Sequence, residues 1–177
     1  MPKYNKMNDK FILDACCGPR QMWTNKKHPQ AIYIDIREEK KGLNPYRKNE
    51  HITPDIVMDF RDMEFEDETF KLVVFDPPHL LGTGNPSESK MMLRRKYGIL
   101  DKLNWRGDLK QGFDECWRVL EEYGVLIFKW AESNIKWKEI LKVIGRKPLF
   151  RNILREGTYW ACFMKLPEKY ILQETLE

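Results

Sequence analysis

The stretch from Leu72 to Leu81, with the sequence LVVFDPPHLL, decides how the rest of the chain is interpreted. Its first four residues are apolar, a pattern typical of a strand that is buried on both faces of a parallel sheet. Because proline lacks a backbone N–H and fixes φ, Pro77 and Pro78 end the strand in a stiff turn. Asp76 and His79 therefore stand at the carboxyl end of a buried strand, where open α/β sheets bind ligands. The alternative is a loop with an ordinary capping aspartate.

Length and composition indicate one globular domain spanning residues 1–177, with a core from about residue 10 to 165. Charged residues make up 33% of the chain and hydrophobic residues 42%, as in ordinary globular proteins. No apolar run approaches the roughly 20 residues that cross a bilayer, and the first ten residues lack the apolar core of a secretory signal. A cytoplasmic protein without a membrane partner is expected.

The cysteines predict neither disulfides nor a metal site. There are four, without a C-x-x-C pair, and the adjacent Cys16 and Cys17 suit neither a mutual disulfide nor a zinc knuckle. Free thiols in a reducing compartment are expected, with Cys16, Cys17, Cys116 and Cys162 as packing residues rather than ligands. No metal is predicted.

Three strands are expected before the central one, over residues 10–13, 31–35 and about 55–58, and each runs to an aspartate. The first enters the small residues Ala15, Cys16, Cys17 and Gly18, which allow close approach of the backbone to a ligand. A short helix is expected from about residue 20 to 27. The acid ending the second strand lies about twenty residues beyond the first turn, the spacing at which an acidic side chain meets ribose hydroxyls.

Four successive strands thus end in carboxylates, and parallel strands bring these ends to one edge of the sheet; the residues are Asp14, Asp35, Asp59 and Asp76. Mutual repulsion would raise some of their pKa values unless a positive or hydrogen-bond-donating ligand lay among them. A nucleoside carrying a sulfonium and an ammonium group meets that need. The G-x-G-x-x-G and P-loop fingerprints are missing, which disfavours dinucleotides and phosphates.

The connection from residue 82 to 107 is long and basic. Residues 82–110 hold seven Lys/Arg and three Asp/Glu, a net of +4 that equals the formal charge of the whole chain. Tyr97 and Trp105 lie among these charges, a mixture that suits an anionic partner with stackable bases. A solvated basic loop and, for Trp105, packing in the core are the alternatives.

The second half of the chain alternates helices with strands. Apolar spacing predicts a helix over 108–122 that ends at Gly124. A strand over 125–128 follows and leads to Lys129. We expect Lys129 to be a solvated strand end; contact with a phosphate is the alternative. A second helix, capped by Asn134 and stopped by Gly145, precedes a hairpin of strands at about 149–154 and 158–164. Residues 166–177 read as a polar tail.

With these elements in place, the chain resembles the class I S-adenosylmethionine-dependent methyltransferases over roughly residues 10–165. Asp14-Ala15-Cys16-Cys17-Gly18 resembles their first motif, Asp35-Ile36 the ribose-binding acid and its neighbour, and Asp59-Phe60 the adenine-contacting pair. Asp76-Pro77-Pro78-His79 resembles the [DNS]-P-P-[YFW] tetrad of amino-group methyltransferases, and the chain's length is similar to that of small phage-type enzymes. The resemblance implies a single-domain, Rossmann-like α/β fold with a mostly parallel seven-stranded sheet, order 3-2-1-4-5-7-6, and an antiparallel last strand.

The resemblance also implies roles for particular residues. Asp76 and the Pro77 carbonyl would accept hydrogen bonds from the target amino group, His79 would stack on the target base, and Asp76 would also reach the cofactor ammonium group. Arg94, Arg95 and Trp105 are the expected substrate contacts. The first motif has one glycine where many relatives have two or three, His79 replaces the usual larger aromatic, and no separate recognition domain is present.

The substrate follows less firmly than the chemistry. Adenine N6 in DNA, with loose sequence preference, is the first hypothesis, since the basic segment favours nucleic acid. The same reaction on RNA or on a protein glutamine is the alternative, because the tetrad occurs in all three groups. A silent module that binds cofactor or nucleic acid is the third hypothesis. Cytosine C5 chemistry is disfavoured because the tetrad lacks a nucleophilic cysteine. Oligomeric state is not predicted.

Overall fold

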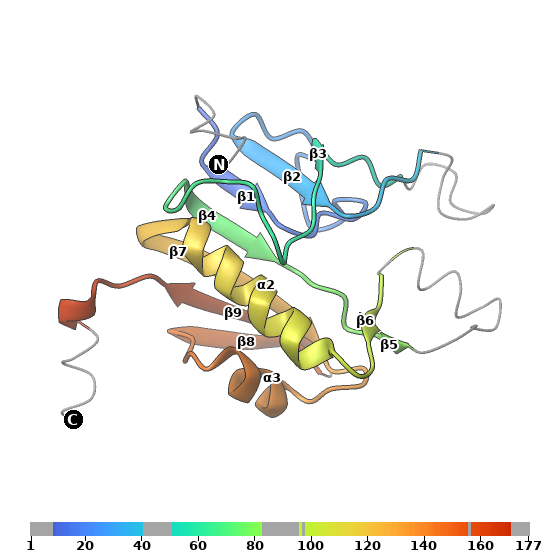
Figure 1. Ribbon diagram of the computed structural model, residues 1–177, viewed down its shortest axis with the longest axis vertical. Helices are drawn as coiled ribbons and strands as arrows, with labels where there is room; N and C mark the ends of the chain where they lie inside the picture. The colour runs from blue at the N-terminus through green and yellow to red at the C-terminus, as the bar shows by residue number, and fades with distance from the viewer. Residues whose placement is uncertain (1–8, 41–50, 83–95, 97, 156, 171–177) are drawn as a thin grey trace.

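A seven-stranded sheet forms the centre of the molecule (Figure 1). The computed structural model describes residues 9–40, 51–82, 96, 98–155 and 157–170. The strands, in spatial order, are β3 (Ile56–Val57), β2 (Ala31–Asp35), β1 (Ile12–Asp14), β4 (Phe70–Phe75), β7 (Leu120–Ala131), β9 (Thr158–Met164) and β8 (Phe150–Arg155). Two short strands, β5 (Leu81–Gly82) and β6 (Leu100–Asp101), pair separately beside the carboxyl ends of the main strands.

The strand order of the main sheet is the predicted one. With β5 and β6 set aside, its strands follow the order 3-2-1-4-5-7-6 along the chain. β1, β2, β3, β4 and β7 pair in parallel, whereas β9 is antiparallel to both β7 and β8. The predicted turn at Gly157 makes the hairpin possible, because its φ of +68° is a left-handed conformation that glycine adopts without strain.

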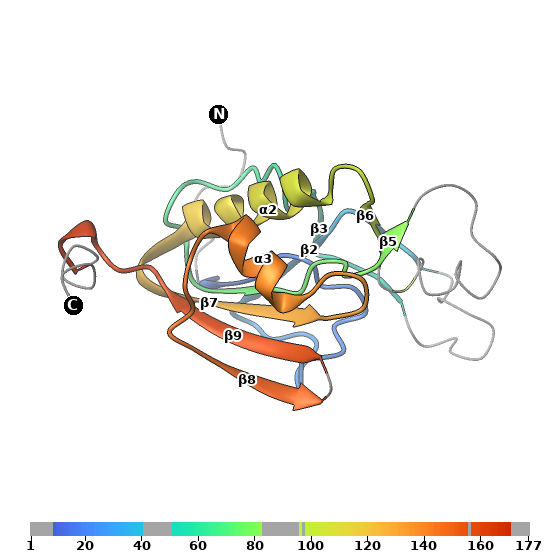
Figure 2. The ribbon, with the colours of Figure 1, turned by 90° about the horizontal axis from the view of Figure 1, so that it is seen from below.

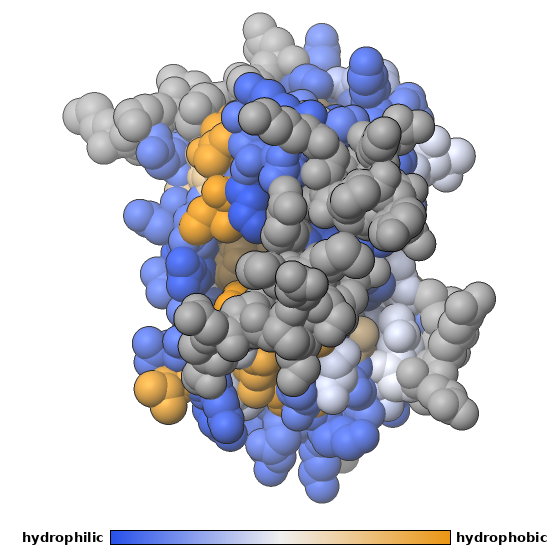
Figure 3. Space-filling model, turned by 90° about the vertical axis from the view of Figure 1, so that its right-hand side faces the viewer, coloured by the Kyte–Doolittle hydropathy of each residue, from blue (hydrophilic) through white to orange (hydrophobic). Residues whose placement is uncertain are grey.

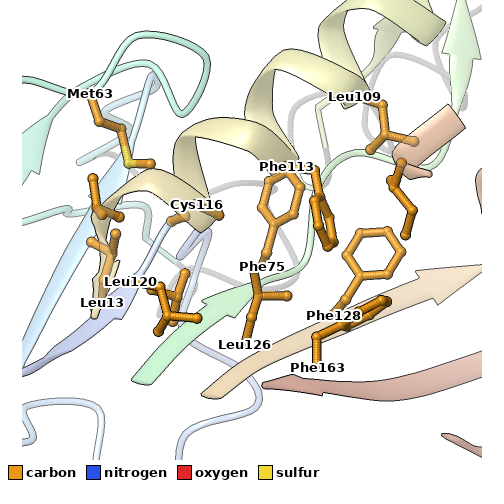
Figure 4. Close-up of a cluster of buried hydrophobic side chains, with 14 of the residues drawn as sticks. Leu13, Met63, Phe75, Leu109, Phe113, Cys116, Leu120, Leu126, Phe128 and Phe163 are labelled. Carbon is orange, nitrogen blue, oxygen red and sulfur yellow. The ribbon is translucent and has the colours of Figure 1, made fainter. Parts of the chain in front are cut away.

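The core lies between the sheet and two helices on the same face, α2 (Trp105–Val119) and α3 (Trp137–Ile144) (Figure 2). Figure 4 shows Phe113 pointing from α2 toward Phe128 and Phe163 of the sheet. Its ring centroid lies 5.9 Å and 5.2 Å from theirs, in edge-on contacts worth about 0.5–1.5 kcal/mol each. Neither described helix is long and apolar enough to cross a membrane.

Three of the four ends of α2 and α3 differ from those predicted. α2 starts three residues before Asp108 and ends at Val119, because Leu120 already pairs with Phe70 in the sheet. α3 ends as predicted at Gly145, whose φ is +68° and whose N–H bonds the Leu141 carbonyl. The predicted cap by Asn134 is wrong, since its side-chain oxygen accepts the Leu81 N–H instead.

The helix predicted over residues 20–27 is absent from the structure, which has turns there. This segment has no apolar repeat at helical spacing, and a short helix without a packed face does not recover its nucleation cost. Arg20 has a φ of +53°, and its guanidinium lies 3.7 Å from the centre of the Tyr33 ring. The guanidinium also bonds the Lys26 and Thr53 carbonyls, so tertiary contacts organise the segment.

Candidate functional site

A cleft of about 400 Å³ opens at the edge where β1, β2, β4 and β7 end. Figure 3 faces this edge and shows apolar surface between hydrophilic side chains. The volume suits a small organic ligand. Apart from Asp14, the cleft brings together every residue predicted from the cofactor motifs and the tetrad: Ala15, Cys16, Cys17, Gly18, Asp35, Ile36, Asp59, Phe60, Asp76, Pro77, Pro78 and His79.

One wall of the cleft is the loop that follows β1. The Ala15 N–H bonds the Val74 carbonyl and the Cys17 N–H bonds the Ile34 carbonyl, both at 2.9 Å, so the loop stays attached to its two neighbouring strands. Gly18 then turns with a φ of +46° and donates its N–H to Asp35 Oδ2 at 2.9 Å. The single glycine of the motif thus lies where the chain adopts a left-handed conformation, which glycine takes without strain.

Asp14 lies behind this wall and does not line the cleft. It is completely buried and accepts hydrogen bonds from Trp23 Nε1 at 2.6 Å and from the Cys16 N–H at 3.3 Å. Burial raises the pKa of Asp14 to about 7, against the lowering effect of these two bonds. The predicted cofactor contact by Asp14 is therefore not a direct one in this structure; the side chain supports the loop.

Asp14→Asn is expected to remove a pH dependence of stability. An ordinary aspartate titrates at 3.8 and the folded Asp14 at about 7, so the folded state holds an extra proton between these values and loses stability as pH rises through them. Asparagine does not ionise. Its single side-chain oxygen keeps only one of the two acceptor contacts, so the variant also loses stability by an amount that does not depend on pH. Relative to wild type, the free energy of unfolding of Asp14→Asn should therefore rise with pH, by at most on the order of 4 kcal/mol between pH 3.8 and about 7. Urea denaturation at several pH values measures this difference.

The exposed Asp9 offers a matched control for that experiment, since Asp9→Asn should show the wild-type pH dependence. A constant difference between Asp14→Asn and wild type at every pH would show that Asp14 does not gain a proton on folding.

Asp35 at the end of β2 and Asp59 after β3 each form a salt bridge with the arginine two residues later in the chain. Arg37 bonds both oxygens of Asp35, with Nε and Nη2 each at 2.9 Å. Arg61 bonds both oxygens of Asp59 and also reaches Asp108 of α2 at 2.9 Å. Burial acts to raise the pKa of Asp59, but the hydrogen bonds and charge of Arg61 outweigh it and lower this pKa. Sequence reasoning missed this role, although an Asp-x-Arg pattern after both strands was its visible signal.

Each Asp-x-Arg unit presents an apolar residue between its charged ends. Ile36 lies between Asp35 and Arg37 and Phe60 between Asp59 and Arg61, and both line the cleft. Ile36 is 54% exposed although it follows a fully buried strand. The cleft therefore has apolar surfaces flanked by paired charges.

The tetrad turn leaves β4 beside the end of β7. Phe75 pairs with Phe128 in the parallel register, so Asp76 and Lys129 come next to each other. Lys129 Nζ lies 2.5 Å from Asp76 Oδ2, and Lys129 lines the cleft rather than being the solvated strand end that was predicted. Burial raises the pKa of Asp76, and the charge and hydrogen bond of Lys129 act against that rise.

His79, the last tetrad residue, is partly buried at the cleft. Its ring centre lies 6.5 Å from that of Trp130, with the two planes nearly perpendicular. Burial lowers the pKa of His79 below its ordinary value of 6.5, although Asp76 acts in the opposite direction. Burial thus favours the neutral imidazole, and the charge of Asp76 favours the protonated one.

Repulsion among the four carboxylates is only partly balanced: Asp35 and Asp76 help to raise the pKa of Asp14, as the sequence argument expected. Arg37, Arg61 and Lys129 each pair with one of them, and burial favours the neutral form of Asp14. The chain thus supplies cations of its own at this edge, which the sequence argument did not include.

The expected substrate contacts are placed differently. Trp105 is 5% exposed and belongs to the core, the alternative position that the sequence allowed, so its ring is not available to a base here. Arg94 and Arg95 lie outside the described residues, as does Tyr97. Lys96 lines the cleft. Gly98 also lies at the cleft, packed so closely on the tetrad that a Cβ there would come within 3.0 Å of Pro78.

The cysteines offer no thiolate nucleophile at the cleft. All four are free, and burial raises the pKa of the Cys16 and Cys17 thiols well above the ordinary value. Within the part of the chain that the structure describes, no group of three or more His, Cys, Asp or Glu side chains is arranged to hold a metal ion.

No protein-family model and no curated protein sequence match this chain. Solved structures do. The PH0226 protein of Pyrococcus horikoshii superimposes with a TM-score of 0.57 at 16% identity, over 87% of this chain and 81% of that one. The N-methyltransferase NodS of Bradyrhizobium japonicum gives 0.53 at 13% identity, over 89% and 86%. The chain has the class I methyltransferase fold.

A third structure with the methyltransferase fold is the 1,6-didemethyltoxoflavin-N1-methyltransferase of Burkholderia thailandensis, solved with bound S-adenosylhomocysteine. It superimposes with a TM-score of 0.51 at 11% identity, over 89% of this chain and 71% of that one. At identities this low, the superpositions establish the methyltransferase fold alone, because a shared fold does not imply a shared function.

Proposed function

We propose that this protein is an S-adenosylmethionine-dependent methyltransferase that modifies the exocyclic amino group of a nucleobase, with adenine N6 in DNA as the first substrate to test. One observation carries the proposal: a single cleft is lined by both groups of motif residues. These are the Asp76-Pro77-Pro78-His79 turn and the residues of the motifs that resemble a cofactor site, namely 15–18, Asp35 and Phe60. A methyl donor and an amino-group acceptor could therefore meet within one site.

The residues present fit the cofactor. Ile36 and Phe60 offer apolar surface for an adenine ring, and Asp35 is the acid available for ribose hydroxyls. Asp35 already accepts two hydrogen bonds on each oxygen, from Gly18 and Arg37, so the Arg37 guanidinium must turn outward for ribose to bind. When bound, S-adenosylmethionine supplies a methyl group on a positively charged sulfur, which keeps the C–S electron pair as the methyl group leaves.

The chain's own residues would then act on the acceptor. The lone pair of a nucleobase amino nitrogen is delocalised into the ring, which makes the nitrogen a poor nucleophile. Asp76 and the Pro77 carbonyl accept its two N–H groups, which turns the lone pair out of the ring plane toward the methyl carbon. Holding the reacting atoms in line accounts for much of the acceleration. The nitrogen forms its new C–N bond and releases one proton to Asp76 or to water.

A transfer assay with substrates of each class tests the proposal. Methyl-labelled S-adenosylmethionine is incubated with double-stranded DNA, single-stranded DNA, transfer RNA, ribosomal RNA and a protein extract. Label in DNA is expected, since the basic segment over 82–110 favours a nucleic acid. Label in RNA or protein alone would overturn DNA as the substrate. Cofactor binding without label anywhere would overturn the proposed activity.

His79→Ala is expected to lower kcat/KM for the nucleic acid by roughly 5- to 150-fold, because base stacking on an aromatic side chain contributes about 1–3 kcal/mol. His79→Phe keeps an aromatic ring of larger area and should retain at least wild-type kcat/KM. Steady-state kinetics of both variants measure the contrast. Equal activity of His79→Ala and wild type would show that this side chain does not stack on the target.

A further inference from the structure

Lys129 lines the cleft and forms an ion pair with Asp76 of the tetrad, although the sequence predicted no role for it in the reaction. Its neighbours in β7, Phe128 and Trp130, are buried in the core, so the alternation of a strand directs Lys129 to the opposite face. The parallel register with β4 brings it to Asp76, and the antiparallel register with β9 pairs it with Trp160. The ammonium lies 5.9 Å from the centre of the Trp160 ring.

The ion pair occupies only one of the two carboxylate oxygens. Lys129 Nζ bonds Oδ2 of Asp76 at 2.5 Å, and among the described residues no hydrogen bond to Oδ1 is found. The side chain of Asp76 is 20% exposed and that of Lys129 26%. One oxygen is thus held by the ammonium, while the other is available to an amino group in the cleft.

The surroundings of Asp76 otherwise disfavour its charge. Burial is the largest influence and raises the pKa of Asp76, and Asp14 of β1 adds a nearby acid. Lys129 is the main opposing group, with a smaller contribution from His79 of the same turn. The Cys16 thiol also faces this carboxylate, and burial raises the pKa of that thiol, so it is neutral. A protonated Asp76 would lose acceptor capacity toward a substrate N–H.

We propose that Lys129 is a positioning residue of the transfer reaction: its ammonium keeps Asp76 ionised and fixes one carboxylate oxygen, so that the other accepts the N–H of the target amino group. This inference rests on the proposed function. In this inference, a residue of β7 assists the tetrad, which follows β4.

The test compares Lys129→Met and Lys129→Arg with wild type. Lys129→Met should raise the pKa of the Asp76 carboxyl by at least about one unit, because an opposite charge at this distance lowers a carboxyl pKa by that amount or more. The ¹³C NMR signal of this carboxyl, titrated without cofactor, reports the shift. The rate of single-turnover methyl transfer at neutral pH should fall by about 100-fold, the loss that a misplaced reacting group causes. The acid limb of the pH–rate profile should move to higher pH. Affinity for S-adenosylhomocysteine should be nearly unchanged.

Lys129→Arg keeps the charge and should restore most of the rate and the wild-type acid limb. Lys71→Met is the matched control, because Lys71 forms an exposed pair with Glu121 between the same two strands at the opposite end of the sheet. It should behave as wild type in every measurement.

The outcomes separate this inference from the proposed function. Wild-type transfer together with an unshifted Asp76 titration and an unchanged rate in Lys129→Met would overturn the role of Lys129 alone. Absence of transfer by the wild-type protein would overturn the proposed function and, with it, a role of Lys129 in that reaction.

Discussion

Asp76→Ala is expected to reduce single-turnover methyl transfer by on the order of 100- to 1000-fold, the loss found when one preorganised hydrogen-bonding group is removed from an active site. Alanine offers no acceptor for the amino N–H, and it leaves the Lys129 ammonium without its carboxylate partner. Transfer of labelled methyl from S-adenosylmethionine measures the loss. Thermal unfolding and binding of S-adenosylhomocysteine, measured in parallel, report whether fold and cofactor site persist.

Asp76→Asn is the informative control for this experiment. Its amide oxygen still accepts one N–H, and asparagine occupies this position in part of the [DNS]-P-P-[YFW] group that the chain resembles. Its rate should therefore lie well above that of Asp76→Ala. An Asp76→Ala rate within about tenfold of wild type would show that this carboxylate is not the group that activates the amino nitrogen.

Gly112→Ala is expected to weaken cofactor binding by at least about tenfold, since the added Cβ would lie 2.3 Å from the Phe60 ring and 3.1 Å from that of Phe75. Phe75 is fully buried, so the Phe60 ring must move, and it lines the cleft. Overpacking of this kind costs about 1–3 kcal/mol of stability, against a gain of at most about 1 kcal/mol from helix propensity. Calorimetric titration with S-adenosylhomocysteine and thermal unfolding measure the two effects.

Gly107→Ala is the control that separates the effect of overpacking from that of helix propensity. This glycine lies in the same helix, and a Cβ there meets nothing within 4 Å. The variant should raise stability slightly and leave binding unchanged. If both variants bind S-adenosylhomocysteine as wild type does, Phe60 is not part of the cofactor site.

The strands could be predicted because each parallel strand is a short apolar run that ends in a recognisable residue, whereas their order in the sheet followed from the resemblance to class I methyltransferases. Phe70–Phe75 stops at two prolines, and the hairpin turns at Gly157. Helix ends were predicted less well. Whether Leu120 continues α2 or begins β7 depends on its pairing with Phe70, fifty positions earlier in the chain, and local spacing carries no such information.

The gathering of the candidate site could also be predicted, since parallel strands release their carboxyl ends along one edge. The direction of each side chain could not. Asp14 turns inward to Trp23, while Asp35, Asp59 and Asp76 each pair with a cation. The ion pair of Asp76 with Lys129 depends on the register between β4 and β7, which a single sequence does not specify.

The position of the transferred methyl group tests the central claim most directly. Wild-type protein is incubated with DNA and S-adenosylmethionine carrying a ¹³C-labelled methyl group, and the digested nucleosides are analysed by mass spectrometry against standards. The proposed acceptance of two N–H groups by Asp76 and the Pro77 carbonyl predicts that the label lies on an exocyclic amino nitrogen, with N6-methyladenine as the main product. Label on a ring nitrogen, on a carbon or on oxygen would contradict the account, because those acceptors present no amino group to Asp76.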